Sequence, residues 1–261
     1  MTAADIGVTS TTRKADSVDL TVLLTVYKRA TLRRQLHAIM GQTVRPERIV
    51  IFQNGNYQHV SNRYMAKRGV EVVRNSANTG FFGRFAYLLG AKTRSVAVLD
   101  DDIIPGPKFI ENYLRQLERF GGIIGGNGRI ALSNFYYGEL ERPPDVGIRE
   151  EPTLVDFVGH AWFFSKDLLF DMFSFRPFTF TTGEDMHLCF SAKLRSASPS
   201  IVAAQPSLAE SCDVALNRYA KSGPASFKST SEETRKSVET YFQSKNLDFI
   251  TPREQKLFRT G

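Results

Sequence analysis

Three consecutive carboxylates, Asp100 to Asp102, directly follow the apolar run 96–99 and precede Pro105-Gly106-Pro107. The apolar run is typical of a strand buried on both faces, and the proline and glycine residues end that element. Carboxylates this close together repel one another and lose hydration, so a divalent cation would stabilise them. In an extended chain Asp100 and Asp102 project to one side and Asp101 to the other. Oxygen ligands of this kind suit Mg²⁺ or Mn²⁺, which in turn suit a diphosphate.

A solvated acidic turn is the alternative interpretation of the triplet, because carboxylates are mostly exposed and short motifs match by chance. The apolar run and the Pro-Gly-Pro segment favour a ligand site, since they place the carboxylates at the end of a strand. Open α/β sheets bind ligands at that end of their strands. The sequence therefore predicts a metal and diphosphate site at residues 100–102.

The elements that would position the triplet alternate between strand and helix over residues 19–119. Apolar periodicity predicts strands over 19–26, 48–52, 70–74 and 95–99, and helices over 31–41, 57–67, 81–92 and 107–119. Such repeats with short loops predict an α/β fold with right-handed crossovers and a parallel sheet. The loops after the strands then meet at one edge, which gathers Tyr27, Arg29, Asn54, Asn78 and the triplet.

The second half of the chain has a different pattern. Gly121 to Gly128 is glycine-rich around two isoleucines, which favours close backbone packing or a mobile loop and marks a loose seam between two halves. A strand or a pair of strands is expected over 155–164. Helices are expected over 182–194, with Thr182 as the N-cap, and from about residues 229 and 251 onward.

The whole chain has 261 residues, an apolar content of 42%, a formal charge of +7 and a pI near 9.4. This length and apolar content suit one large α/β domain with a sizeable core. The positive charge favours an anionic partner such as a nucleotide, an anionic glycan or a membrane surface. The basic residues are spread along the chain without zinc-finger or RNA-recognition spacing, which argues against a nucleic-acid partner. Cys189 and Cys212 have no zinc-ligand spacing.

Residues 1–18 are rich in Thr, Ser, Ala and Asp and contain no apolar core. They are expected to form a disordered tail before a single domain over 19–261, and they lack the pattern of a signal peptide or an anchor. No later window approaches the length of a membrane span. The chain is therefore expected to be soluble and cytoplasmic, with a peripheral membrane contact left open.

Five short motifs occur in an order that resembles the GT-A fold glycosyltransferases that use nucleotide sugars. Thr25-Val26-Tyr27-Lys28-Arg29 resembles their T-x-Y-x-R entry, Leu99-Asp100-Asp101-Asp102 their D-x-D element, and Gly183-Glu184-Asp185 their late E-D motif. Asn78-Thr79-Gly80 is similar to the N-x-G of family 2, and Gly83-Arg84-Phe85 to an N-R-F in exostosin-like enzymes. The resemblance covers residues 20 to about 195. It implies a Rossmann-like, mostly parallel sheet flanked by helices, with a nucleotide-binding half over 19–120 and an acceptor half over 121–261.

The same resemblance implies roles for individual residues. Those lining the pocket for uridine or another base would be Thr25, Tyr27, Arg29 and Asn54. Those near the diphosphate or donor sugar would be Asn78, Arg84 and Asp101, while Asp100 would approach the ribose and Asp102 the metal. The metal and Arg84 would neutralise charge on the departing diphosphate. Asp185, with Glu184 beside it, would face the acceptor hydroxyl, as a general base in an inverting enzyme and as an orienting group in a retaining one.

Several residues of the second half have more than one interpretation. Glu184 and Asp185 also fit the first turn of a helix, where the macrodipole favours negative charge. Trp162 fits the core better than a sugar-stacking platform at the acceptor cleft, and His160 fits a structural role better than an acceptor contact. His187 fits a helix surface better than a metal site.

Three classes of function are compatible with these motifs. The favoured one is a metal-dependent glycosyltransferase that moves a sugar from a UDP-sugar or similar donor to a carbohydrate acceptor. A sugar-nucleotide nucleotidyltransferase is the second, although residues 25–29 contain no glycine and so lack the glycine-rich first loop of such enzymes. A non-catalytic module that binds nucleotides or glycans is the third, and the intact triplet argues against it. The lack of a Q-x-x-R-W motif and of membrane spans argues against a processive polysaccharide synthase.

Overall fold

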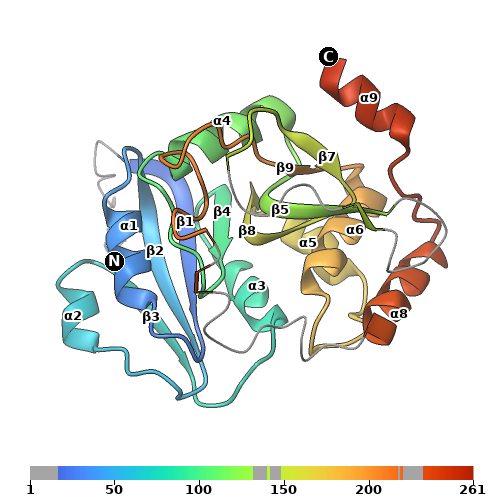
Figure 1. Ribbon diagram of the computed structural model, residues 1–261. Coiled ribbons are helices and arrows are strands. Elements are labelled where there is room, and N and C mark those ends of the chain that lie inside the picture. Colours follow the sequence, from blue (N-terminus) through green and yellow to red (C-terminus); the bar gives the residue numbers. More distant parts are fainter. Residues whose placement is uncertain (1–16, 132–139, 142–147, 217, 220–231, 261) are drawn as a thin grey trace, which may run out of the picture.

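The computed structural model describes residues 17–131, 140–141, 148–216, 218–219 and 232–260. Its centre is one twisted sheet with helices packed against it (Figure 1). Along the sheet the strand order is β3-β2-β1-β4-β8-β5-β9-β7, and β6 pairs with β5 outside this path. The α/β fold with a helix-flanked sheet is as the sequence predicts.

The amino-terminal half alternates strand and helix as expected. Its elements are β1 (Ser17–Val26), α1 (Leu32–Met40), β2 (Arg45–Asn54), α2 (Asn62–Ala66), β3 (Glu71–Asn75), α3 (Phe82–Leu88), β4 (Ser95–Leu99) and α4 (Phe109–Phe120). The strands β3, β2, β1 and β4 are neighbours and all run parallel. Their carboxyl ends therefore lie at one edge, which is the arrangement that brings the loops after them together.

The carboxyl-terminal half extends the same sheet with strands of mixed direction. Its elements are β5 (Ile123–Ala131), β6 (Leu140–Glu141), β7 (Thr153–Val155), β8 (Phe157–Ser165), α5 (Leu168–Ser174), α6 (Glu184–Ser196), β9 (Ser200–Val202), α8 (Glu232–Gln243) and α9 (Pro252–Thr260). Strand β8 lies antiparallel between β4 and β5, and β9 lies parallel to β5. The antiparallel β8 thus joins the two halves directly.

Most of the glycine-rich run belongs to strand β5, which confirms the close backbone packing expected there and excludes a mobile loop. Its glycines serve close packing: a Cβ on Gly125 would lie 2.2 Å from the Cβ of Val158 on the neighbouring strand. The start of the first strand also differs from the sequence prediction. Strand β1 begins at Ser17, which pairs with Arg45, so the expected tail boundary at residue 18 is two residues too late. Residues 1–16 lie outside the described residues.

The core has two layers, one on each face of the sheet. Alternate residues of β8 supply both layers, with Trp162 and Phe164 on one face and Phe163 on the other. Helices α3, α5 and α6 contribute to the first layer, and α1 and α4 to the second. The ring of Phe85 on α3 packs edge-on against Trp162 with centroids 5.6 Å apart. This packing fixes α3, and with it Arg84, against the sheet.

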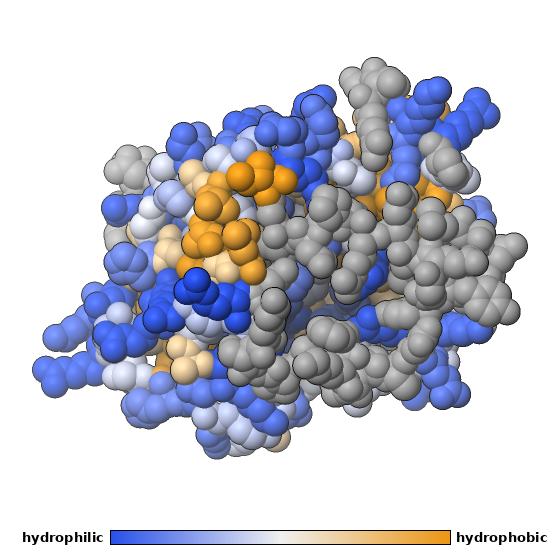
Figure 2. Space-filling model, in the orientation of Figure 1, coloured by the Kyte–Doolittle hydropathy of each residue, from blue (hydrophilic) through white to orange (hydrophobic). Residues whose placement is uncertain are grey.

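The coloured part of the surface in Figure 2 is mostly hydrophilic, with an apolar patch toward the upper left of this face. Exposed apolar side chains of the described chain include Leu208, Val214 and Leu216, all on the segment between β9 and α8. Among the described helices, none combines the length and the apolar character that crossing a bilayer requires.

Candidate functional site

The acidic triplet lies at the carboxyl end of β4, and α1 holds its backbone in place. The buried side chain of Gln35 donates hydrogen bonds to the carbonyls of Asp100, at 2.5 Å, and of Ile103, at 2.8 Å. The hydroxyl of Thr31 donates to the carbonyl of Asp101. The turn that presents the three carboxylates is therefore fixed by residues outside any of the recognised motifs.

Arg84 links the first carboxylate to the second half of the chain. Its Nη1 donates to Asp100 Oδ1 at 2.5 Å and to Thr25 Oγ1 at 3.1 Å, and its Nη2 donates to Glu184 Oε1 at 3.0 Å. The guanidinium lies 4.8 Å from the centroid of the Trp162 ring, and only 3% of the residue is exposed. An arginine this deeply buried is stabilised by its two carboxylate partners and by the ring beneath it.

Arg29 neutralises the other two carboxylates. Its Nη1 donates to Asp101 Oδ1 at 2.5 Å, and its Nη2 lies 3.4 Å from Asp102 Oδ2. Its Nε also donates to the carbonyl of Tyr219 at 3.1 Å. Arg29 therefore faces the triplet, and its predicted place in a base pocket stays a prediction. Two arginines thus relieve part of the repulsion that the sequence assigned to a cation alone.

A bulge in β8 brings His160 to the triplet. Gly125 of β5 pairs with Trp162 of β8, and Asn127 of β5 pairs with Gly159 of β8. Two steps along β5 thus match three steps along β8, so β8 carries one extra residue. His160 sits in this bulge with φ of 66°, a left-handed conformation that is uncommon outside glycine. Its carbonyl accepts a hydrogen bond from Asp100 N at 3.0 Å. Bulges of this kind often redirect a side chain beside an active site.

Asp100, Asp102 and His160 form a group that could hold a metal ion. Each offers one ligand atom, and these atoms lie within 4.8 Å of one another. Asp102 Oδ1 is buried and has no hydrogen-bond partner among the described residues, which fits a ligand atom that awaits a cation. Burial, followed by the neighbouring Asp100, raises the pKa of Asp102 to about 6. Two carboxylates and an imidazole suit Mn²⁺, and the carboxylates also suit Mg²⁺.

Asn54 and Asn78 occupy the edge next to the triplet. Asn54 Nδ2 donates to Asn78 Oδ1 at 2.8 Å and to the carbonyl of Gly80 at 3.1 Å. Its Oδ1 accepts from the amide and the hydroxyl of Thr79, at 2.7 and 3.0 Å. Every hydrogen-bonding position of the Asn54 amide is used within the protein. Asn54 therefore holds the 78–80 loop and has nothing left for a base, whereas Asn78 Nδ2, 3.5 Å from the Tyr27 hydroxyl, keeps one proton for a ligand.

Glu184 and Asp185 open α6 at the far side of Arg84. Burial, with the adjacent Asp185, raises the pKa of Glu184 to about 8, although Arg84 opposes this. Burial also raises the pKa of Asp185, whose Oδ1 accepts a hydrogen bond from Met186 N at 2.8 Å. The two acids thus have different surroundings: Glu184 accepts a hydrogen bond from Arg84, while the charge of Arg235 on α8 lowers the pKa of Asp185 against the effect of burial.

Two sequence interpretations near this site, those of Thr182 and His187, need correction, whereas the favoured core position of Trp162 is confirmed. The expected N-cap Thr182 is replaced by Gly183, which has φ of 74° and offers no side-chain cap. His187 is buried instead of lying on the helix surface, and its Nε2 lies 2.8 Å from the carbonyl of Met172. Trp162 is 2% exposed and its Nε1 donates to the carbonyl of Val158 at 2.8 Å, so its ring belongs to the core and offers no face to a sugar.

Comparison with known proteins supports the fold. Neither a protein-family model nor a curated protein matches this sequence. Among solved structures, the chain is similar to S. aureus TarS residues 1–349, with a TM-score of 0.52 and 14% identity over 72% of this chain and 58% of that one. It is also similar to S. aureus TarS, with a TM-score of 0.50 and 14% identity over 71% of this chain and 34% of that one. The fold is of the GT-A type. The match spans less than two thirds of either TarS chain, and at this identity the likeness shows the fold alone.

Sequence reasoning missed the roles of His160, Gln35 and Thr79. The signal for His160 was its place between a glycine and an alanine in a strand, where a bulge is easily formed. Gln35 stands on the buried face of the first helix, and a polar residue there needs partners that sequence alone cannot name.

Proposed function

We propose that this protein is a metal-dependent glycosyltransferase that moves a sugar from a nucleoside-diphosphate donor, with UDP favoured, to a carbohydrate acceptor. The observation that carries the proposal is the group of Asp100, Asp102 and His160 at the carboxyl edge of a GT-A type sheet. The two acids come from the end of β4 and the histidine from the adjacent strand β8. At this edge a cation and a diphosphate would meet, as in other open α/β sheets.

The residues around this group have distinct tasks in the proposed reaction. Asp100, Asp102 and His160 would hold Mn²⁺ or Mg²⁺, which when bound neutralises charge on the departing diphosphate. Arg29 and Arg84 flank the carboxylates and bring positive charge to the same edge. Tyr27 and Asn78 offer a ring and an amide proton to the base or ribose. Arg84 belongs to the positioning network as well, because its side chain fixes Asp100 relative to α6.

Asp185 is the residue assigned to the acceptor hydroxyl, and Glu184 is a positioning residue. Glu184 directs an oxygen to Arg84, so it orients the guanidinium that holds Asp100. Asp185 has a raised pKa, which suits a group that accepts a proton during transfer. In an inverting reaction Asp185 would take the acceptor proton, and in a retaining one it would orient the acceptor.

The alternative functions receive no additional support from the geometry. A nucleotidyltransferase would use a phosphate-binding first loop, whereas here the residues after β1 turn Arg29 toward the triplet. A non-catalytic binding module would not explain why the Asp102 and Asp185 carboxylates are held in this site. A cytoplasmic location and a peripheral membrane contact stay predictions from the sequence.

The proposal is tested by incubating the full chain with a set of UDP-sugars and Mn²⁺ and following released UDP and pyrophosphate separately. A glycosyltransferase releases UDP without pyrophosphate, by transfer or by slow donor hydrolysis. Pyrophosphate release would identify a nucleotidyltransferase, and the absence of both products with every donor would contradict the proposal. A thermal-shift panel of UDP, GDP, CDP and dTDP with and without Mn²⁺ selects the donor base first.

A further inference from the structure

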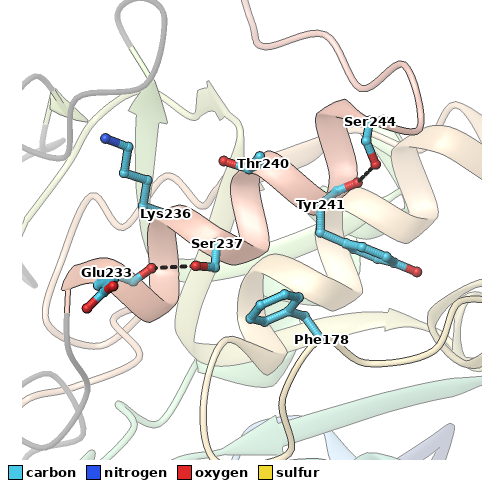
Figure 3. A pocket seen from close by; sticks show the side chains of 7 residues that line it. All are labelled: Phe178, Glu233, Lys236, Ser237, Thr240, Tyr241 and Ser244. Atoms are coloured by element: carbon cyan, nitrogen blue, oxygen red, sulfur yellow. Dashed lines mark hydrogen bonds between the residues drawn. The ribbon is translucent and has the colours of Figure 1, made fainter.

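A pocket between helix α8 and the loop before α6 lies outside the metal group (Figure 3). Its volume is about 460 Å³, which is in the range of small-molecule sites. Phe178 of the loop and Tyr241 of α8 supply its aromatic part, with ring centroids 6.3 Å apart and planes tilted by 47°. Phe178 is 52% exposed, so a ligand in the pocket can reach its ring.

We propose that this pocket is a subsite for a sugar unit of the carbohydrate acceptor, beyond the unit that reacts. The proposal rests on the proposed function and deepens it, because it names the part of the chain that selects an oligosaccharide. Its ligand chemistry follows from the lining. An exposed ring face attracts the apolar C–H face of a pyranose, and a rim of hydroxyl groups exchanges hydrogen bonds with sugar hydroxyls.

The rim carries three hydroxyl groups, beside the charged side chains of Glu233 and Lys236. Ser237 and Thr240 of α8, with Ser244 directly after its end, line one side of the pocket, and Figure 3 shows them above and beside the two rings. Ser237 Oγ donates to the carbonyl of Glu233 at 2.8 Å, and Ser244 Oγ donates to the carbonyl of Tyr241 at 2.7 Å. With their protons donated to backbone carbonyls, both oxygens keep lone pairs that can accept hydrogen bonds from a sugar.

Helix α8 and the loop before α6 connect the pocket to the part of the site that contains Asp185. Val238 of α8 packs against Gly183, since a Cβ on that glycine would lie 3.3 Å from Val238 Cγ2. The charge of Arg235, one turn before Val238, lowers the pKa of Asp185. The loop also contacts the donor side: a Cβ on Gly80 would lie 2.4 Å from the carbonyl of Phe180. A chain whose reacting hydroxyl lies at Asp185 would therefore extend along α8.

The test measures glycan binding alone, without nucleotide or metal. Fluorescently labelled full-length protein is applied to an array of defined neutral and anionic oligosaccharides and their monosaccharides. We expect retention by one class of oligosaccharide and none by its monosaccharide. Phe178→Ala should lower that retention about tenfold, since a lost stacking contact of about 1.4 kcal/mol is a factor of ten. Phe170→Ala is the matched control, because Phe170 is 61% exposed on α5 and does not line the pocket.

A second variant tests the pocket at another position. Tyr241 is left unchanged, because its ring also packs on the core and its loss could unfold the protein. Thr240→Trp fills the pocket from an exposed helix position and should abolish retention while circular dichroism and melting temperature stay unchanged. Retention that survives both Phe178→Ala and Thr240→Trp, or no retention of any oligosaccharide by the wild type, would overturn the subsite. Donor hydrolysis with Mn²⁺ is measured on the same samples, so a failure of the proposed function is seen separately from a failure of the pocket.

Discussion

Arg84 and Glu184 stand 100 residues apart in the sequence, yet Arg84 Nη2 donates to Glu184 Oε1 at 3.0 Å in the interior of the site. The same guanidinium holds Asp100. One buried side chain therefore ties the carboxyl end of β4 to the first turn of α6. The two halves that the motifs divide between donor and acceptor are joined by this contact, so the geometry of one half depends on the other.

Arg84→Met should destabilise the fold strongly. It leaves Asp100 and Glu184 facing each other without their shared cation, and breaking a buried ion pair costs about 3–5 kcal/mol. Glu184→Gln keeps an oxygen that accepts from Arg84 and should cost much less. Urea unfolding of the three proteins measures the difference. Equal losses of unfolding free energy in the two variants would show that Arg84 is not the centre of this network.

Asn54→Asp should weaken nucleotide binding through the 78–80 loop. The new carboxylate loses the two N–H donors and repels Asn78 Oδ1 and the Gly80 carbonyl, which Asn54 now holds. We expect UDP affinity to fall about tenfold, which corresponds to about 1.4 kcal/mol. Asn56→Asp, which introduces the same charge on an exposed loop residue nearby, is the control. If both variants bind UDP alike, Asn54 has no positioning role.

The sequence predicted the amino-terminal half well because there local pattern and tertiary structure agree. The run 95–99 is apolar at four positions and is buried as β4 with the same bounds. The glycine-rich β5 was missed because glycine has low strand propensity and its use becomes visible only when Val158 fills the space above Gly125. Strand pairings between distant segments, such as β8 with β4, leave no local signal.

The site was predicted in part. The motifs place Arg29, Arg84 and the triplet at one edge, and the structure brings them into contact. The partners inside that edge could not be read from the sequence, because hydrogen-bond saturation of Asn54 and the bulge at His160 depend on chain segments that meet only after folding. Trp162 was correctly favoured as a core residue, and its contact with Arg84 was not foreseen.

Asp185→Asn should distinguish a role of Asp185 in the chemical step from a role in stabilising the start of helix α6. If Asp185 serves the acceptor hydroxyl, turnover should fall by about 10²-fold or more while UDP affinity is kept. If it only complements the helix dipole, the cost should be about 0.3–1 kcal/mol of stability with little loss of activity. Calorimetry with UDP and a transfer assay are therefore run on the same preparation. Near-wild-type turnover would return Asp185 to a structural role.

The free energy of unfolding should fall as the pH rises from about 4.5 to about 7, because of the side chain of Glu239. Burial, with Asp156 nearby, raises the pKa of Glu239 from 4.5 to about 7. The unfolded chain releases this proton above about pH 4.5 while the folded chain retains it until about pH 7, so the contribution to stability is present below that window and lost across it. The loss is at most about 3.5 kcal/mol, since one pKa unit is worth about 1.4 kcal/mol.

The Glu239 prediction is checked by urea unfolding at several pH values between 4 and 8. Glu239→Gln has no proton to lose and should show a flatter profile than the wild type. Parallel profiles for the two proteins would mean that Glu239 titrates in the folded chain as it does in water.

The central claim, a cation held by the triplet and His160, is tested most directly by calorimetric titration of UDP with and without Mn²⁺. For the wild type we predict that Mn²⁺ strengthens UDP binding. In Asp102→Asn that gain should disappear, with affinity in Mn²⁺ lower by about tenfold or more. Asp167→Asn removes the same charge at an exposed residue away from the triplet and should behave as the wild type. Mn²⁺-dependent UDP binding that is unchanged in Asp102→Asn would contradict the account.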